Sequence, residues 1–322
     1  TITPSGKAEQ TNYKVTYATG TLTITKAETM TLTPELTGKD AEKEYDSKPL
    51  SGGATASVTK GTKITYSTDG GKTWSETLPS ITNVGTLNVK AKAENKNYKD
   101  VTVDYKLKVT RKAVTVTADN KSKVFGEKDP ELTATVAGTL GDDTVDYKLS
   151  REDGEDVGTY TITPSGKAEQ TNYKVTYATG TLTITSQSID PGTDPEKPNP
   201  DYTGAKVDSP SDEVYDGNEH KWIPTVTDKA DKKLEAGKDY TVEYSTKNFI
   251  DVGTIDVTIT GIGNYTGTVT RTYKITPKSV TVTANDKTKV FGETDPKLTA
   301  TVAGTLGNDT VKYDVAREAG EN

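Results

Sequence analysis

Apolar and polar residues alternate along most of the chain. Between 101 and 109 the Val, Tyr and Leu side chains all fall on odd positions, with Thr, Asp and Lys between them. This alternation is typical of a β-strand with one face buried and one in water. It recurs at 87–93, 114–118 and 255–259, and no segment keeps the spacing of an amphipathic helix. The pattern predicts an all-β chain.

The chain also repeats itself. Residues 1–25 recur letter for letter at 161–185, and residues 112–156 are echoed by 278–322. A fainter repeat has three signatures: an aromatic residue before a turn, then Val-Gly-Thr, then Asn-Tyr before a Thr-rich strand. The aromatic positions are Tyr45, Phe125, Tyr215 and Phe291; Val-Gly-Thr begins at Val84, Val157 and Val252; Asn-Tyr begins at Asn97, Asn172 and Asn264. Short strands in a fixed order, with turns between them, predict sandwich modules stacked in a row.

These repeats predict where each module begins and ends. The fold expected is all-β, a tandem array of small Ig-like β-sandwich modules, elongated. The segments are the C-terminal half of a module at 1–25, complete modules at 26–111, 112–185 and 202–276, a Pro-rich linker at 186–201, and the N-terminal half of a module at 277–322. The prolines of the linker favour an extended polyproline II spacer.

The two half modules complement each other. Thr1 aligns with Thr161 and Asn322 with Asp156, so the chain resembles a window on a longer array. A half sandwich leaves strand edges and core residues unpaired. We therefore expect 278–322 to pack against residues 1–25 of a neighbouring copy, in head-to-tail succession.

Composition narrows the class of protein. Hydrophobic residues make up 31%, but 17 tyrosines add apolar area, which indicates small, lean cores. The chain has no cysteine, so disulfides are excluded, and its net charge of −7 comes from interspersed acids and bases. Because no basic stripe is present, nucleic acid is not an expected partner. No apolar run is long enough to span a membrane, and no export or anchoring signal occurs in this sequence.

Residues 112–185 resemble the MBG domain of the YGX type found in large bacterial surface proteins. The resemblance rests on VFGEKDP at 124–130, LTATV at 132–136, VGTY at 157–160, NY at 172–173 and TLTIT at 181–185. Phe125 and Phe291 stand where tyrosine is usual, an exchange that keeps the ring and is expected to matter little. Residues 26–111 and 202–276 are similar to YDG-type or bacterial Ig-like modules. The resemblance implies an extracellular stalk on a bacterial surface, anchored to the cell wall outside this region, which projects a distal functional region.

One local motif resembles the Asp-box of sialidases. Residues 67–74 read STDGGKTW, a sequence that fits a hairpin in which Asp69 binds the amides of the turn and Trp74 folds onto the strands. Because this motif occurs only once in the chain, we expect it to be a structural hairpin and not part of a catalytic site. Because His220 is the only histidine, neither a His-based triad nor a multi-histidine zinc site can form, so no enzyme activity and no resident cofactor are expected. We expect His220 at the surface.

The sequence bears on three further kinds of site. Calcium is an alternative at Asp142, Asp143, Glu127 and Asp129, although solvated turn acids explain these carboxylates as well. The closing strands hold no Asn or Gln, which argues against self-formed isopeptide crosslinks. A sugar-binding platform is a candidate at Trp74, Trp222 and Tyr66, against a packing role for the same rings. Two alternative functions stay open: the modules themselves bind host glycan or matrix protein, or the chain assembles head-to-tail into a filament.

Overall fold

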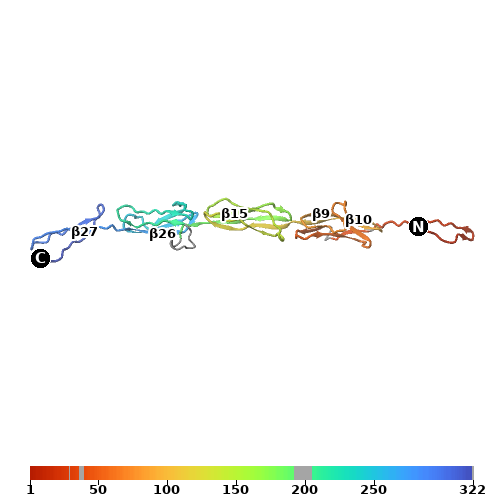
Figure 1. Cartoon of the computed structure of the whole chain (residues 1–322), viewed down its shortest axis with the longest axis horizontal. Coiled ribbons are helices and arrows are strands. Elements are labelled where there is room, and N and C mark those ends of the chain that lie inside the picture. Colours follow the sequence, from red (N-terminus) through yellow and green to blue (C-terminus); the bar gives the residue numbers. More distant parts are fainter. Residues whose placement is uncertain (29, 36–39, 192–204, 321–322) are drawn as a thin grey trace. The chain divides into compact units, whose positions relative to one another are not determined.

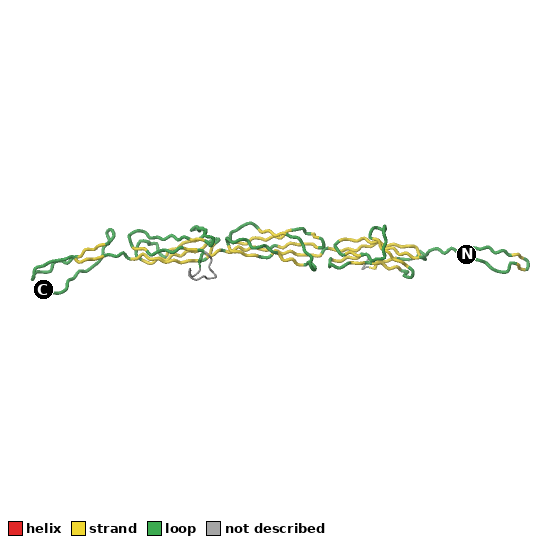
Figure 2. The backbone as a smooth tube through the Cα atoms, viewed as in Figure 1, coloured by secondary structure: helices red, strands yellow, loops and turns green. Residues whose placement is uncertain are grey.

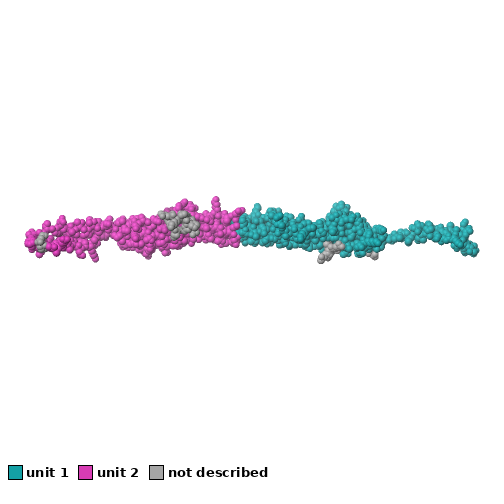
Figure 3. All heavy atoms as spheres, turned by 60° about the horizontal axis from the view of Figure 1, so that its bottom comes forward, with its two compact units in different colours: residues 1–119, 132–151, 162–180 teal, residues 120–131, 152–161, 181–322 magenta. Residues whose placement is uncertain are grey.

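The computed structural model describes residues 1–28, 30–35, 40–191 and 205–320. All regular elements among these residues are β-strands (Figures 1 and 2), which confirms the all-β prediction. No helix long and apolar enough to cross a membrane occurs in the described ranges. The chain divides into two compact units (Figure 3). The first unit comprises residues 1–119, 132–151 and 162–180, and the second comprises 120–131, 152–161 and 181–322. The predicted module 112–185 therefore contributes residues to both units.

In the first unit, residues 26–111 fold as a β-sandwich. One layer is a four-stranded sheet in the order β4 (Ala41–Glu44), β10 (Tyr98–Thr110), β9 (Gly85–Asn95), β7 (Thr62–Ser67). Two strand pairs complete it: β3 (Leu32–Glu35) with β6 (Gly53–Ala56), and β5 (Leu50–Ser51) with β8 (Ser80–Ile81). The core is the apolar face that the alternation predicts, and Ala91, Ala93 and Leu107 are fully buried.

The first unit also holds one sheet of the segment 112–185. Its order is β13 (Ala134–Ala137), β11 (Lys112–Ala118), β17 (Tyr173–Ala178), β16 (Glu169–Gln170). Strand β14 (Lys148–Arg151) pairs with residues 162–165 of β15 (Gly158–Ser165). In the second unit, β12 (Lys121–Val124) pairs in parallel with β18 (Gly180–Thr185). Ile162, Leu182 and Ile184 are almost fully buried.

The second unit contains the sandwich of the fourth module. Its main sheet runs β21 (Glu213–Val214), β26 (Thr268–Thr276), β24 (Gly253–Gly261), β23 (Tyr240–Tyr244). Smaller pairs are β20 (Lys206–Val207) with β22 (Val226–Thr227), and β19 (Gln187–Ser188) with β25 (Tyr265–Thr266). Ile189 is fully buried in this core, so the module includes residues before the predicted boundary at 202. The predicted polyproline spacer falls mainly on 192–201, outside the described residues.

The aromatic signature has the same backbone partner in every complete module. The strand before the aromatic residue runs parallel to the closing Thr-rich strand, as in β4 with β10. The amide N–H of Tyr45, Phe125 and Tyr215 donates to the last threonine carbonyl of that strand, at 2.9, 2.8 and 2.9 Å. This hydrogen bond fixes the aromatic ring at the point where the chain leaves the module.

The two terminal segments form hairpins with few buried side chains. In residues 1–25, β1 (Glu9–Gln10) pairs with β2 (Tyr13–Lys14), in the register that the identical segment has between β16 and β17. In residues 277–322, β27 (Thr281–Ala284) pairs with β28 (Ala300–Ala303), in the register of β11 with β13. Each half therefore keeps the local pairing of the complete module.

Candidate functional site: the joints between modules

The Asn-Tyr signature of one module contacts the Val-Gly-Thr signature of the module before it. Asn172 Oδ1 accepts a hydrogen bond from the amide of Val84 at 2.9 Å, and its Nδ2 donates to Asn83 Oδ1 at 3.1 Å. These residues are almost 90 positions apart and belong to different modules of the first unit. Asn172 is 7% exposed, so the joint removes this amide from water.

Aromatic rings form the second half of the same joint. Tyr45, the signature aromatic of module 26–111, meets the ring of Tyr173 edge to face at 5.6 Å between centroids. Both hydroxyls donate to Asp143 Oδ2, Tyr173 at 2.5 Å and Tyr45 at 3.2 Å. Edge-to-face pairs of this kind add favourable energy beyond the area they bury. The joint thus has two parts. One is the pair of hydrogen bonds made by the Asn172 side-chain amide, which we call the amide clasp. The other is the Tyr45–Tyr173 ring pair, whose hydroxyls share the Asp143 carboxylate.

The joint between modules 112–185 and 202–276, which lies in the second unit, repeats this arrangement. Asn264 Oδ1 accepts from the amide of Val157 at 2.8 Å, and its Nδ2 donates to Asp156 Oδ1 at 2.8 Å. Phe125 meets Tyr265 at 5.5 Å, and the Tyr265 hydroxyl donates to Asp228 Oδ2 at 3.3 Å. The same signature residues therefore build both joints.

The phenylalanine at position 125 changes the joint in one respect. Tyr45 and Tyr215 each donate a hydroxyl to a carboxylate of the following segment, Asp143 and Asp309, at 3.2 Å. Phe125 has no hydroxyl, and its joint instead carries an ion pair between Glu127 and Lys229 at 2.7 Å. The expectation that the exchange matters little holds for the ring contact but not for the polar contact.

Burial and the neighbouring carboxylates keep the joint phenols protonated. Desolvation, followed by the hydrogen bond to Asp143, raises the pKa of Tyr173 to about 12. Desolvation, followed by the charge of Asp228, raises the pKa of Tyr265 to about 12. A phenol can donate to a carboxylate only while it is protonated. Both hydroxyls are thus donors throughout the physiological pH range.

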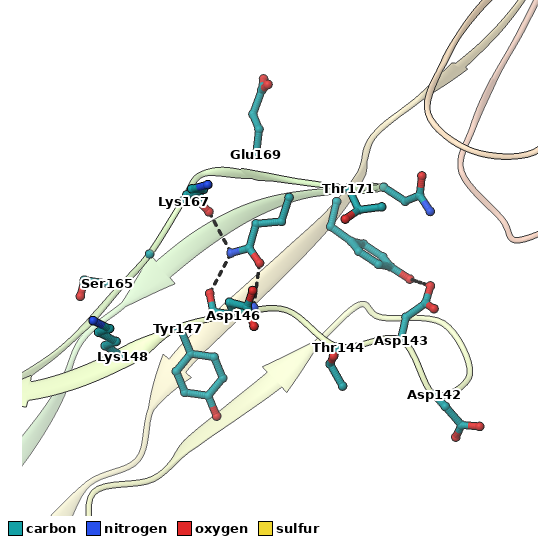
Figure 4. Close-up of a pocket in the computed structure, with 14 residues that line it drawn as sticks. Asp142, Asp143, Thr144, Asp146, Tyr147, Lys148, Ser165, Lys167, Glu169 and Thr171 are labelled. Atoms are coloured by element: carbon teal, nitrogen blue, oxygen red, sulfur yellow. Dashed lines mark hydrogen bonds between the residues drawn. The ribbon is translucent and has the colours of Figure 1, made fainter.

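A groove of about 970 Å³ lies beside the first joint, between residues 142–148 and 165–173 (Figure 4). Figure 4 shows the Asp143 carboxylate at the end of the dashed hydrogen bond that it accepts from the Tyr173 hydroxyl. Hydrogen bonds from Gln170 link the two segments that line the groove. Its Nε2 donates to the carbonyl of Asp146 at 2.8 Å, and its Oε1 accepts from the Asp146 amide at 2.7 Å. The groove is lined by carboxylates, ammonium groups and amides, which suits polar contacts rather than an apolar ligand.

Three of the four carboxylates named for calcium, Asp143, Glu127 and Asp129, have protein partners. Asp143 accepts the two tyrosine hydroxyls, and Glu127 pairs with Lys229. Asp129 and Glu155 bind the ammonium of Lys123, at 2.7 and 2.5 Å, and this lysine side chain is only 3% exposed. Burial lowers the pKa of Lys123, but the bonds to Asp129 and Glu155 outweigh it and raise the pKa. Across the described part of the chain, no three acidic or histidine side chains gather as a metal site.

Of the three aromatic residues named for sugar binding, Tyr66 lies in a core and Trp222 packs against one. Tyr66 is 8% exposed and its hydroxyl accepts from the amide of Ala54, so its ring is removed from the candidate platform. Trp222 is half-buried and packs against the core of its module. Trp74 is half-buried as well, with the ammonium of Lys92 4.8 Å from its ring centroid.

His220 lies less open than the sequence suggested. Its side chain is 16% exposed, and Nε2 is 2.8 Å from Asp216 Oδ1 of the aromatic-turn signature. Its backbone carbonyl accepts the hydroxyl of Tyr273 at 2.7 Å. The histidine is therefore a partly buried residue in a loop of module 202–276, held by contacts with Asp216 and Tyr273.

The hairpin at 67–74 is built as predicted. Asp69 Oδ1 accepts from the amides of Lys72 and Thr73, at 2.9 and 3.0 Å, and Oδ2 accepts the Thr73 hydroxyl at 2.7 Å. Gly70 and Gly71 take φ values of +78° and +96°, which favour glycine. The indole Nε1 of Trp74 donates to the carbonyl of Gly71 at 3.1 Å. The hydroxyls of Ser67 and Thr73 hold the pKa of Asp69 well below its usual range.

Sequence reasoning identified the signatures but not their partners. In the sequence, Asn172 and Asn264 mark the approach to a Thr-rich strand, and Asp143 is a candidate calcium ligand or a solvated turn acid. In the structure these three residues form the contacts between modules. A signal was present, because the Asn-Tyr and Val-Gly-Thr signatures keep their order while the loops between them vary in length. That constancy fits two surfaces that must match each other.

Comparisons with known proteins identify part of the chain. The family model described as MBG domain (YGX type) matches residues 114–183 and 280–322, which confirms the resemblance over both segments. No curated protein matches the sequence.

Solved structures with a similar fold share little sequence. The I-band fragment I67–I69 of titin has 15% identity, with 78% of this chain and 98% of that chain covered, and a TM-score of 0.27. The extracellular domains 3–5 of Drosophila OTK have 9% identity, with 80% and 100% covered, and a TM-score of 0.21. Values this low support no argument about function.

Proposed function

We propose that this chain, which carries MBG domains of the YGX type at 114–183 and 280–322, is the repeat region of an extracellular bacterial surface protein. Its role is that of a spacer: it projects a distal functional region away from the cell. This role depends on the length of the array and on the contacts between its modules, and it requires no catalytic residue.

The joints carry this proposal. A spacer must resist folding back on itself, and each joint adds an amide clasp and a ring pair to the covalent link between modules. In linear arrays, stability is a sum of module terms and nearest-neighbour interface terms. Because each module carries the residues that form the joint, an added module can bind its neighbour through the same contacts. The length of the array therefore grows with the number of repeats.

The test is an internal deletion in the surface-displayed protein. Removing 112–185 deletes one complete module, and the height of an epitope tag at the distal end is then measured by axial fluorescence localisation on intact cells. We expect the tag to move toward the cell surface by about the length of one module. A matched insertion of a second copy of 112–185 should move it outward. An unchanged height in both variants would contradict the spacer function, and a tag found only inside the cell would contradict the extracellular location.

A further inference from the structure

The first and last strands of the segment 112–185 pair in parallel in both units. In the first unit, residues 112–117 of β11 face residues 173–178 of β17. In the second unit, β12 faces residues 182–185 of β18. Every pair in both ladders joins residues that are 61 positions apart. Because this offset stays the same, no residue is inserted or lost where the two strands pass from one sheet to the other.

The short stretch between the two ladders is also held by close contacts. Asn120 Oδ1 accepts from the amide of Thr181 at 2.9 Å and from the hydroxyl of the same residue at 3.1 Å. Gly180 carries no side chain where the strands approach each other, and a Cβ there would lie 2.4 Å from the carbonyl oxygen of Ala118. The contact between the first and last strands thus continues between the ladders.

Both strands are joined directly to the neighbouring modules. We call residues 112–124 together with residues 173–185 the parallel clamp. Only Arg111 separates the start of the clamp from the closing strand of the preceding module, which ends at Thr110. Only Ser186 separates the end of the clamp from β19, the first strand of the following module. A pull along the chain therefore reaches the clamp at the N-terminal end of its first strand and at the C-terminal end of its last strand.

This direction of pull decides how the hydrogen bonds are strained. In a parallel pair, the N-terminal end of one strand and the C-terminal end of the other lie at opposite ends of the ladder, so the pull slides the strands past each other. All bonds of the ladder then share the force, whereas a pull on the two adjacent ends of an antiparallel hairpin breaks its bonds one after another. We infer that the array carries tension as well as providing length, and that the parallel clamp is the part of 112–185 that resists it.

The other two complete modules have the same arrangement with shorter pairings. In module 26–111 the parallel pairings are a bridge between Ala27 and Tyr98 and the ladder of β4 with β10. The sequence between these two pairings includes β3, which pairs with β6 instead. In the fourth module, the ladders of β19 with β25 and of β21 with β26 each span two residues. Because fewer bonds share the force, both modules should unfold at lower tension than 112–185.

Pulling on single molecules of the full chain tests this inference. The chain has no cysteine, so thiol-linked handles can be placed at chosen residues. With one cysteine added at each end, we expect one unfolding step for each complete module, and the step of 112–185 at the highest force. The released length, about 3.3–3.6 Å for each residue, identifies the step. Inserting a second copy of 112–185 should add a second step of the same kind. The result does not depend on the spacer function, since failure of the deletion test on cells would leave these forces unchanged.

The same segment pulled in another direction is the matched control. Lys148→Cys with Ser165→Cys places the handles on facing, exposed residues of β14 and β15, at the open end of an antiparallel pair. The folded structure is then the same and only the direction of the force differs. We expect β14 to separate from β15 at a force several-fold lower than the force that unfolds 112–185 through the chain ends.

Two substitutions at neighbouring positions separate resistance to tension from general stability. Asn120→Ala removes the side-chain hydrogen bonds within the clamp. Asp119→Ala removes instead the carboxylate that accepts the hydroxyls of Thr133 and Thr135, on the side of β13. We expect only Asn120→Ala to lower the force of the 112–185 step, and neither variant to change the separation of β14 from β15. A step for 112–185 at a force no higher than the others, equal forces in the two pulling directions, or equal effects of the two substitutions would each overturn the inference.

Discussion

Tyr45 and Tyr173 share one acceptor, because both hydroxyls donate to Asp143 while their rings meet at an interplanar angle of 87°. The two residues come from consecutive modules, and the acceptor belongs to the second module. A single carboxylate thereby ties the end of one module to the beginning of the next. This geometry turns repeated signatures into contacts between neighbours, and it makes the joints testable one residue at a time.

Removing the amide clasp should loosen the first joint. Asn172→Ala deletes the acceptor of the Val84 amide and the donor to Asn83. Loss of these bonds from a buried position should lower the free energy of opening by about 1–3 kcal/mol. Hydrogen exchange at the Val84 amide measures this directly, because that amide loses its only acceptor.

Asn97→Ala is the control for this variant. Asn97 occupies the same signature position in module 26–111, is exposed, and its side chain makes no hydrogen bond to another module in the described residues. Its replacement should leave exchange at Val84 unchanged. Equal protection of Val84 in Asn172→Ala and in the wild type would show that the clasp contributes nothing.

Alkaline pH should open the joints. The pKa of Tyr173 and of Tyr265 is about 12 in the folded chain against an ordinary 10.0. Because the folded-state pKa is raised, the protonated phenols stabilise the folded form fully below pH 10, and this stabilisation is lost as pH rises toward 12. Ultraviolet absorbance of tyrosinate, followed together with circular dichroism, should show a late group of tyrosines titrating with loss of structure.

Asp143→Asn tests the cause of that shift. Burial contributes most to the raised pKa of Tyr173, and the Asp143 carboxylate contributes next. Without the negative charge, the late titration of Tyr173 should move to lower pH, while Tyr265, which binds Asp228, should not change. A Tyr173 titration that is the same in the variant and the wild type would contradict the role given to Asp143.

Two leucines of identical local sequence should respond differently to truncation. Leu182 is fully buried, so Leu182→Ala should destabilise its module by about 2–5 kcal/mol through lost burial and the cavity left behind. Leu22, in the identical segment, is 65% exposed, and Leu22→Ala should change stability by less than about 0.5 kcal/mol in dilute solution. Denaturant unfolding of the full chain measures both. Comparable losses would show that Leu22 is buried in solution.

The hairpin at 67–74 should resist acid. The Ser67 and Thr73 hydroxyls and the turn amides depress the pKa of Asp69, so its stabilisation is present above the ordinary value of 3.8 and lost only as pH falls well below it. In an NMR titration, the amide shifts of Lys72 and Thr73 should therefore show no midpoint near 3.8. Asp69→Asn should increase exchange at both amides, whereas Asp104→Asn, on β10 two strands away in the same sheet, should not. A midpoint at the ordinary value would contradict the hydrogen-bond pattern.

Much of the fold followed from the sequence because strand formation depends on local pattern. Alternation places Leu107 and Val109 on the buried face of β10, and STDGGKTW encodes its own turn through Gly70, Gly71 and Asp69. The boundaries of the sandwiches were harder to place. Ile189 belongs to the core of the fourth module although the surrounding sequence has the composition of a linker. One buried side chain is too weak a signal to mark a strand in sequence.

The sequence by itself determined that the chain is all-β, that it repeats, and which face of each strand is apolar, since these depend on residues close together along the chain. Only the tertiary structure decided which signatures meet. Asn172 reaches Val84 across a module boundary, and no spacing in the sequence specifies that pair of atoms. The clearest case is the segment that occurs twice: the same 25 residues bury Leu182 and expose Leu22, because burial depends on what packs against a strand as well as on the strand's own residues.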